Sequence, residues 1–225
     1  LLDYLARDFV ESGYSIKQLI RRIVLSATYQ QSSAFNPAAA ELDRENRWLW
    51  RMAPRRLEAE VLRDAMLAVS GELNPALGGP GFRDFDTFTS NSQFYALKDL
   101  DSPDGHRRTI YRTAVRSGRH PLLDAFDCPD PSISSPNRAV TVTPLQALAL
   151  QNNTFALRIS TRFAERARRE AGEQPAEQVR FILQQAFGRE PQPAEAAVLQ
   201  QFVIEYGLPE FCRVIFNASE FLHLD

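Results

Sequence analysis

Hydrophobic residues recur at intervals of three and four in the first part of the chain, the spacing of amphipathic helices that bury one stripe. Two such runs lie on either side of Gly13: Leu2, Leu5 and Phe9, then Ile16, Leu19, Ile20, Ile23 and Val24. They predict two helices packed as a hairpin. The second helix should begin with a capping box, in which Ser15 and Gln18 each bond the other's free backbone N–H.

The same spacing predicts helices in two later parts of the chain. A third helix is expected to turn Trp48, Leu49 and Met52 inward before Pro54 interrupts it. The next helix should end at Gly71 in a left-handed C-terminal cap. A short helix is expected after His120, and five more from residue 143 onward, the first opening with a capping box of Thr143 and Gln146.

The middle of the chain loses helical periodicity. Residues 71 to 106 combine a cluster of glycine and proline with the aromatic residues Phe82, Phe85, Phe88, Phe94 and Tyr95. This composition predicts a long loop or insertion, with aromatics that could stack on sugar or, more often, pack in a core. The β-branched and aromatic run from Thr109 to Val115 suits a strand.

These elements together predict a mainly α fold, a multi-helix globular domain with a long loop insertion and a short β element near residues 107–116. We expect one domain over residues 1–225, with N-terminal helices at 1–70, a loop-rich insertion at 71–142 and a helical bundle at 143–225. Because the chain starts inside an amphipathic pattern at Leu1, we interpret it as a fragment of a larger protein.

Composition narrows the function classes. The formal net charge of −2 provides no field that would attract nucleic acid. The chain also has no run of about 18 apolar residues, the length that a membrane-spanning helix needs. Cys128 and Cys212 are too few and too far apart for a zinc site, and either a disulfide or two free thiols would fit the sequence. The three histidines lack metal-ligand spacing, so we expect no metal site.

The best candidate for a site is the segment from 124 to 153, where a proline-rich loop leads into a helix N-terminus that favours anions. Its polar residues are Asp124, Asp127, Asp130, Arg138, Gln146, Asn152 and Asn153. Asp127 and Asp130 could act as general acid and base if their environments differ. The alternative is structural: turns before prolines, a loop pinned by Arg138, and a cap completed by Gln146.

A basic stretch provides a second candidate. On a strand, Arg108, Arg112 and Arg116 would project from one face and could bind an acidic partner, an anionic glycan or phosphate. Arg119 and His120 continue the stretch. Pairing with the protein's own acidic residues is the alternative.

Several stretches, in this order, carry a resemblance to a known family. They are SATYQQS at 26–32, ENRWLWRM at 45–52, RRLEAE at 55–60 followed by Arg63 and Asp64, VSG at 69–71, RRTIY at 107–111, AFDCPDP at 125–131, TPLQAL at 143–148 and NASEF at 217–221. The chain resembles the C-terminal domain of unknown function of planctomycete proteins that also carry a cytochrome c-like domain. This resemblance covers nearly the whole chain.

The resemblance implies an extracytoplasmic parent protein, periplasmic, envelope-bound or secreted, with haem c on a separate upstream domain. No CxxCH motif occurs in this chain, so no cofactor is assigned to it. We expect a non-catalytic interaction or scaffold module whose partners are upstream domains of the same protein, a polysaccharide or an envelope protein. The alternative is a carbohydrate-active or anionic-glycan-binding domain that uses the 124–153 region.

Overall fold

The computed structural model describes residues 1–116 and 118–224, and it contains eleven α-helices and two small antiparallel sheets within them. This confirms the expected mainly α fold with a short β element. The chain divides into two compact units, one formed by Leu1–Arg55 with the chain end at Leu224, the other by Arg56–His223. The single domain expected from the sequence stays a prediction.

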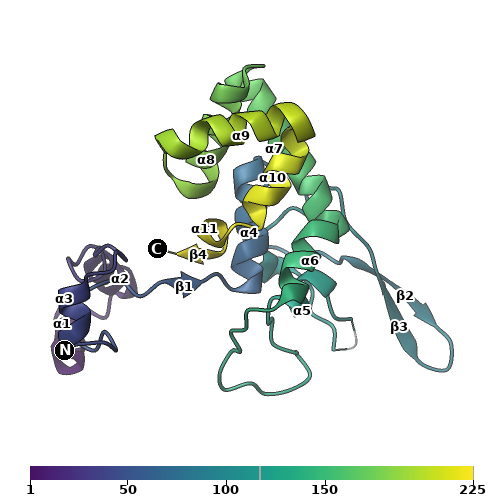
Figure 1. Ribbon diagram of the computed structural model, residues 1–225. Helices are drawn as coiled ribbons and strands as arrows, with labels where there is room; N and C mark the ends of the chain where they lie inside the picture. The colour runs from purple at the N-terminus through teal and green to yellow at the C-terminus, as the bar shows by residue number, and fades with distance from the viewer. Residues whose placement is uncertain (117, 225) are drawn as a thin grey trace. The chain divides into compact units, whose positions relative to one another are not determined.

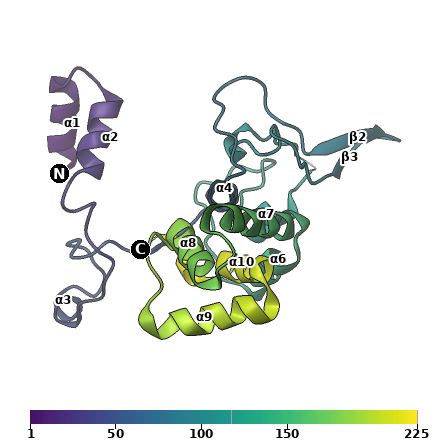
Figure 2. The same ribbon diagram turned by 90° about the horizontal axis from the view of Figure 1, so that it is seen from above.

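Unit 1 contains α1 (Leu2–Glu11), α2 (Ile16–Val24) and α3 (Pro37–Leu42). The first two form the predicted hairpin, which Figure 2 shows as two adjacent helices. Ser15 accepts the Gln18 N–H at 3.4 Å, which is one half of the expected capping box. None of these three helices contains a fully buried residue, although Leu5, Phe9, Leu19 and Val24 are half-buried, so the expected stripe is only partly covered within this unit.

The helix predicted around Trp48 and Met52 is wrong, because residues 43–52 form turns. The Asp43 carboxylate accepts the Trp48 N–H at 2.7 Å, and Asn46 and Leu49 adopt left-handed φ values of 54° and 55°. Asp and Asn side chains compete with the helical ladder by bonding nearby backbone. The Trp48 side chain consequently points outward and is 77 % exposed.

Unit 2 contains most of the helices. They are α4 (Ala59–Ser70), α5 (Pro121–Ala125), α6 (Pro144–Asn152), α7 (Thr154–Ala171), α8 (Pro175–Phe187), α9 (Pro193–Tyr206), α10 (Leu208–Phe216) and α11 (Ser219–Leu222). Two expected helix boundaries are confirmed: Gly71 caps α4 with φ 80°, and the Thr143–Gln146 box opens α6. Asn153 ends α6 and accepts the Phe155 N–H at the start of α7.

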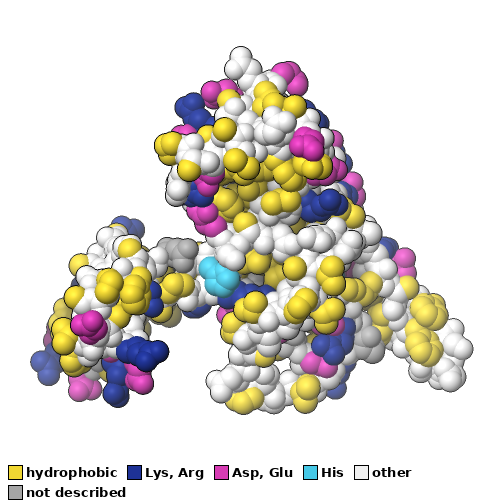
Figure 3. Space-filling view, in the orientation of Figure 1, with side chains coloured by type: hydrophobic (Ala, Val, Ile, Leu, Met, Phe, Trp, Pro, Cys, Tyr) yellow, Lys and Arg dark blue, Asp and Glu magenta, His cyan; other side chains and the backbone are white. Residues whose placement is uncertain are grey.

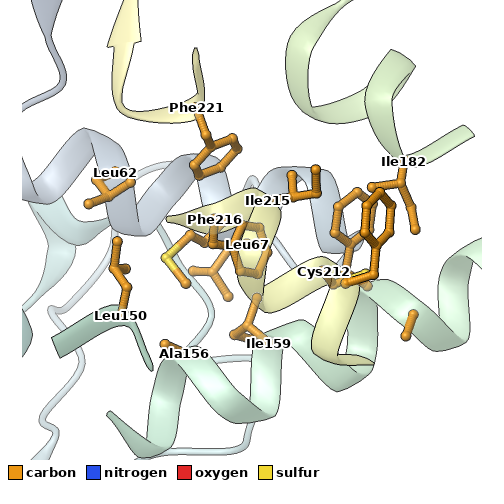
Figure 4. Close-up of a cluster of buried hydrophobic side chains, with 14 of the residues drawn as sticks. Leu62, Leu67, Leu150, Ala156, Ile159, Ile182, Cys212, Ile215, Phe216 and Phe221 are labelled. Carbon is orange, nitrogen blue, oxygen red and sulfur yellow. The ribbon is translucent and has the colours of Figure 1, made fainter. Parts of the chain in front are cut away.

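The core of unit 2 lies where α4, α7 and α10 pack together (Figure 1). Figure 4 shows Leu67 of α4, Ile159 of α7 and Phe216 of α10 meeting at its centre. Phe216 also stacks on Phe163 at a ring distance of 5.8 Å. All of these side chains are fully buried, so this cluster provides the main hydrophobic stabilisation of the fold.

Two short sheets complete the fold. β1 (Arg55–Arg56) pairs with β4 (His223–Leu224), while β2 (Phe85–Thr89) and β3 (Gln93–Leu97) form an antiparallel hairpin. This hairpin projects from the helices of unit 2 (Figures 1 and 2). Phe88 opposes Phe94 across it, and the two rings stack at 5.4 Å.

The strand predicted from Thr109 to Val115 is also wrong. Thr109–Tyr111 is a short 3-10 helix, η1, and the β element lies at 85–97 instead. The Asp64 carboxylate accepts both the N–H and the hydroxyl of Thr109, at 2.7 and 2.6 Å. Pairing of this segment with residues before it is limited to Phe82. Its β propensity is therefore overridden by contacts with α4.

Candidate functional site

A pocket of about 230 Å³ lies in unit 2 between the N-terminal turn of α4, the segment that leads into α5, and the proline-rich loop after α5. Its chemically active side chains are Glu60, Arg112, Arg119, His120, Asp124, Cys128 and Arg138. They come from three separate segments of the chain. We therefore treat this pocket as the candidate site and compare the sequence-predicted residues with it.

Arg112 is held on one wall by a buried ion pair. Its Nε–H donates to Asp84 Oδ2 at 2.6 Å, and the side chains are only 10 % and 8 % exposed. The Arg112 Nη2 and Asp84 Oδ1 atoms are buried without hydrogen-bond partners. A buried guanidinium with unused donors is costly unless another acceptor satisfies them.

His120 lies beside Arg112 and caps α5 by accepting the Leu123 N–H on its Nδ1. Burial, followed by the positive charge of Arg112, lowers the pKa of His120 to about 4. The imidazole is therefore neutral at ordinary pH. Because Nδ1 acts as an acceptor, its proton belongs on Nε2, which makes His120 a neutral donor.

Arg138 fixes the loop onto α4. It donates to both Glu60 oxygens at 2.8 and 2.7 Å and to Glu58 at 3.2 Å. The hydrogen bonds from Arg138 lower the pKa of Glu60, and those to Glu60 raise the pKa of Arg138. Glu60 is therefore an ionised, occupied carboxylate, poorly suited to act as a general acid near neutral pH.

The Cys128 thiol faces Glu60 at 3.7 Å. Burial and the adjacent carboxylate raise the pKa of Cys128 to about 11. Since the thiolate is the reactive species, this cysteine is a weak nucleophile at neutral pH. Cys128 and Cys212 are both free, which resolves the choice between a disulfide and two thiols that the sequence left open.

Asp127 and Asp130, the predicted acid and base pair, do not line the pocket. Asp127 has a left-handed φ of 63° and accepts the Thr141 N–H at 2.8 Å, with Arg56 Nη1 3.5 Å away. Asp130 is half-buried and accepts the Ser132 N–H, a bond that lowers its pKa. Both carboxylates serve loop geometry, so their arrangement lends no support to acid–base catalysis.

The remaining polar residues of the 124–153 segment are also engaged locally. Gln146 completes the α6 cap and donates to the Thr141 hydroxyl, and Asn152 donates to the Leu148 carbonyl. Asp124 does line the pocket, where Arg119 holds it at 2.9 Å. The segment thus contributes Asp124, Cys128 and Arg138 to the site, while Gln146 and Asn153 cap helices and Asn152 bonds within α6.

The three arginines of the basic stretch do not share a face, because the expected strand is absent. Arg108 is exposed and lies 3.6 Å from Asp64, while Arg112 turns inward to the pocket. Arg116 is exposed, and its carbonyl accepts the Ser132 hydroxyl. Sequence reasoning missed Glu60 as a site residue, and no local signal links it to an arginine 78 positions later.

Within residues 1–116 and 118–224, no cluster of three or more His, Cys, Asp or Glu side chains could hold a metal ion. Nor does any helix of that part have the length and apolar character needed to cross a bilayer.

Comparison with known proteins yields one family. The family described as "Protein of unknown function (DUF1553)", PSD1, matches residues 1–203. No curated protein matches the chain. No solved structure matches it either.

Proposed function

Because the chain belongs to DUF1553 (PSD1), a family of proteins of unknown function, we propose that it is a non-catalytic interaction module of a larger extracytoplasmic protein. In this proposal the partner is an upstream part of the same protein, with haem c carried on a separate domain. Family membership supports only the statement that this is a domain of unknown function. The surface of α2 supports the interaction role.

The observation that carries this proposal is the stripe formed by Ile16, Ile20 and Ile23 on α2. These residues are 65 %, 54 % and 38 % exposed, and their spacing places them on one helical face. Figure 3 shows hydrophobic side chains over the visible face of unit 1. A helix rarely keeps such a stripe in water, because burying it against a partner gains free energy.

The chemistry of α2 defines the kind of partner. A shallow groove of about 690 Å³ runs along it, lined by Ile20 and Val24 together with Lys17 and Arg21. The α2 sequence includes no acidic residue. A complementary surface is therefore apolar at its centre and acidic at its rim, as in a protein interface with charge complementarity. A neutral polysaccharide would not match this pattern.

The test is hydrogen–deuterium exchange of α2 in the chain of residues 1–225 and in the protein that also carries the upstream domains. We expect α2 amides to exchange at least about tenfold more slowly in the longer protein, since docking suppresses local opening. Ile20→Asp should abolish most of that difference by placing a charge in the interface.

Gln30→Asp is the matched control, because Gln30 is exposed and lies outside α2 and outside the lining of its groove. It adds the same charge and should leave the protection unchanged. Equal exchange of α2 in both wild-type proteins would overturn the proposal. Protection that rises with the concentration of the short chain would also overturn it, by identifying the occupant as a second copy.

A further inference from the structure

We propose that the pocket beside α5 binds a small carboxylate, with Arg112 as its anchoring donor. This site is separate from α2, and the proposal stands whether or not α2 docks on a partner. Arg112 Nη2 has no hydrogen-bond partner among the described residues, and His120 Nε2 lies 3.9 Å from Asp84 Oδ2, beyond hydrogen-bond distance.

Hydrogen-bond donors exceed free acceptors in the pocket. Arg112 uses its Nε–H on Asp84 and leaves Nη2 without a partner. His120 adds a neutral Nε2–H. The two side-chain carboxylates of the lining are engaged, since Arg138 and Cys128 bond Glu60 and Arg119 lies 2.9 Å from Asp124. These free donors suit a ligand that only accepts hydrogen bonds, and an ionised carboxylate is such a ligand.

The charge of the site favours a monoanion. The lining contains three guanidinium groups and two carboxylates, which leaves one net positive charge. Asp84 pairs with Arg112 from outside the lining, and its negative charge cancels this excess once it is counted. The site therefore has no charge that would compensate the roughly two negative charges of a phosphate group, and a monoanion is the smallest negative charge that Arg112 can pair with.

The size and walls of the pocket favour a compact acid. Its volume of about 230 Å³ is too small for an oligomeric ligand, and Val115, Leu123 and Pro129 provide apolar wall. Arginine presents a planar fork that binds a carboxylate through two parallel hydrogen bonds, which a lysine cannot reproduce. The carboxylate could belong to a free small acid or to the C-terminus of a peptide.

The test is an NMR titration of the chain with sodium acetate, N-acetylglycine and sodium phosphate, at constant ionic strength set with sodium chloride. We expect saturable shifts of the His120 and Arg112 N–H signals with a Kd of about millimolar for acetate, as befits so small a ligand. If N-acetylglycine binds at least as well, the site also accepts a peptide terminus; if it binds less well, the source is a free acid.

Two variants and one control locate the site. Arg112→Lys keeps the charge but removes the fork, and it should weaken acetate binding at least about tenfold. Ala114→Phe, at an exposed position of the lining, should block the pocket without disturbing the Asp84 pair. Arg116→Lys makes the same exchange outside the pocket and should bind like wild type.

Three results would overturn the proposal. The first is the lack of saturable binding of either carboxylate by the folded wild-type chain. The second is phosphate binding tighter than acetate, which would exclude a monoanion site. The third is unchanged acetate affinity in Ala114→Phe, which remains informative even if Arg112→Lys fails to fold.

Discussion

At the scale of single residues, buried arginine side chains order the loops of unit 2 by donating to their backbone carbonyls. Buried Arg63 donates to the Gly105 carbonyl at 2.6 Å and the Arg107 carbonyl at 3.1 Å. Arg107 donates to the Pro80 carbonyl at 2.8 Å and stacks on the Tyr111 ring at 4.0 Å. A planar guanidinium with five donors can satisfy several carbonyls at once, so loops here are ordered by arginine rather than by strands.

His120 provides a residue-scale prediction. In the folded chain its pKa is about 4, against 6.5 ordinarily. Between these values the unfolded chain binds a proton that the native state does not, so stability falls as pH drops through that window, by up to about 3 kcal/mol in all. Arg112 and Arg63 disfavour the added charge, and Asp84 and Asp99 only partly offset them.

The measurement is urea unfolding of wild type and His120→Asn from pH 7 to pH 4. Asparagine caps helices well and does not titrate. The variant should lose less stability over this range, even though carboxylates titrate in both proteins. Parallel pH curves for the two proteins would contradict the assigned shift.

At the scale of elements, the helix ends of unit 2 are set by local chemistry. Gly71 ends α4 in the left-handed region, with its N–H bonded to the Ala68 carbonyl and the Glu72 N–H bonded to the Leu67 carbonyl. These bonds satisfy carbonyls that the helix leaves free. Cap residues could be identified from the sequence because each bond spans only a few positions.

Gly71→Ala tests this cap. The alanine Cβ would be strained at φ 80° and would meet Arg166 Cδ at 3.1 Å. We expect a loss of about 1 kcal/mol in the free energy of unfolding, measured with denaturant, and a smaller loss for Gly71→Asn, which tolerates this region. A stabilised Gly71→Ala would mean that the cap geometry is wrong.

At the scale of the whole molecule, burial is distributed unequally between the two units. Every residue of the hydrophobic core cluster lies between Ala59 and Phe221, within unit 2. Among the described residues of unit 1, Asp43 alone is buried, and it is polar. A unit without an apolar core has little of the free energy that offsets chain entropy, which agrees with a role in binding another surface.

This distribution predicts that unit 2 folds alone. A fragment of residues 56–223 should unfold cooperatively, with a Tm within a few degrees of that of the full chain, because it retains the entire core. Circular dichroism melting of both proteins would check this. A fragment without a cooperative transition would instead favour the single domain expected from the sequence.

The sequence by itself determined most helices and their caps. Hydrophobic spacing at three and four residues and capping patterns such as Thr143 with Gln146 act between near neighbours, so they can be recognised along the chain. Where local signals compete, the sequence led to wrong predictions of secondary structure. The turns around Asp43 and Asn46 displaced an expected helix, and the β-branched run after Thr109 lacked the partner strand that a sheet requires.

Only the tertiary structure decided which side chains meet. Arg138 binds Glu60 across 78 positions, Arg112 binds Asp84 across 28, and Arg63 reaches the Gly105 carbonyl across 42. No periodicity encodes such contacts, because they depend on how the helices pack and where the loops between them lead. The same packing turned Arg112 inward to a pocket, separated it from Arg108 and Arg116, and left the α2 stripe without a cover inside unit 1.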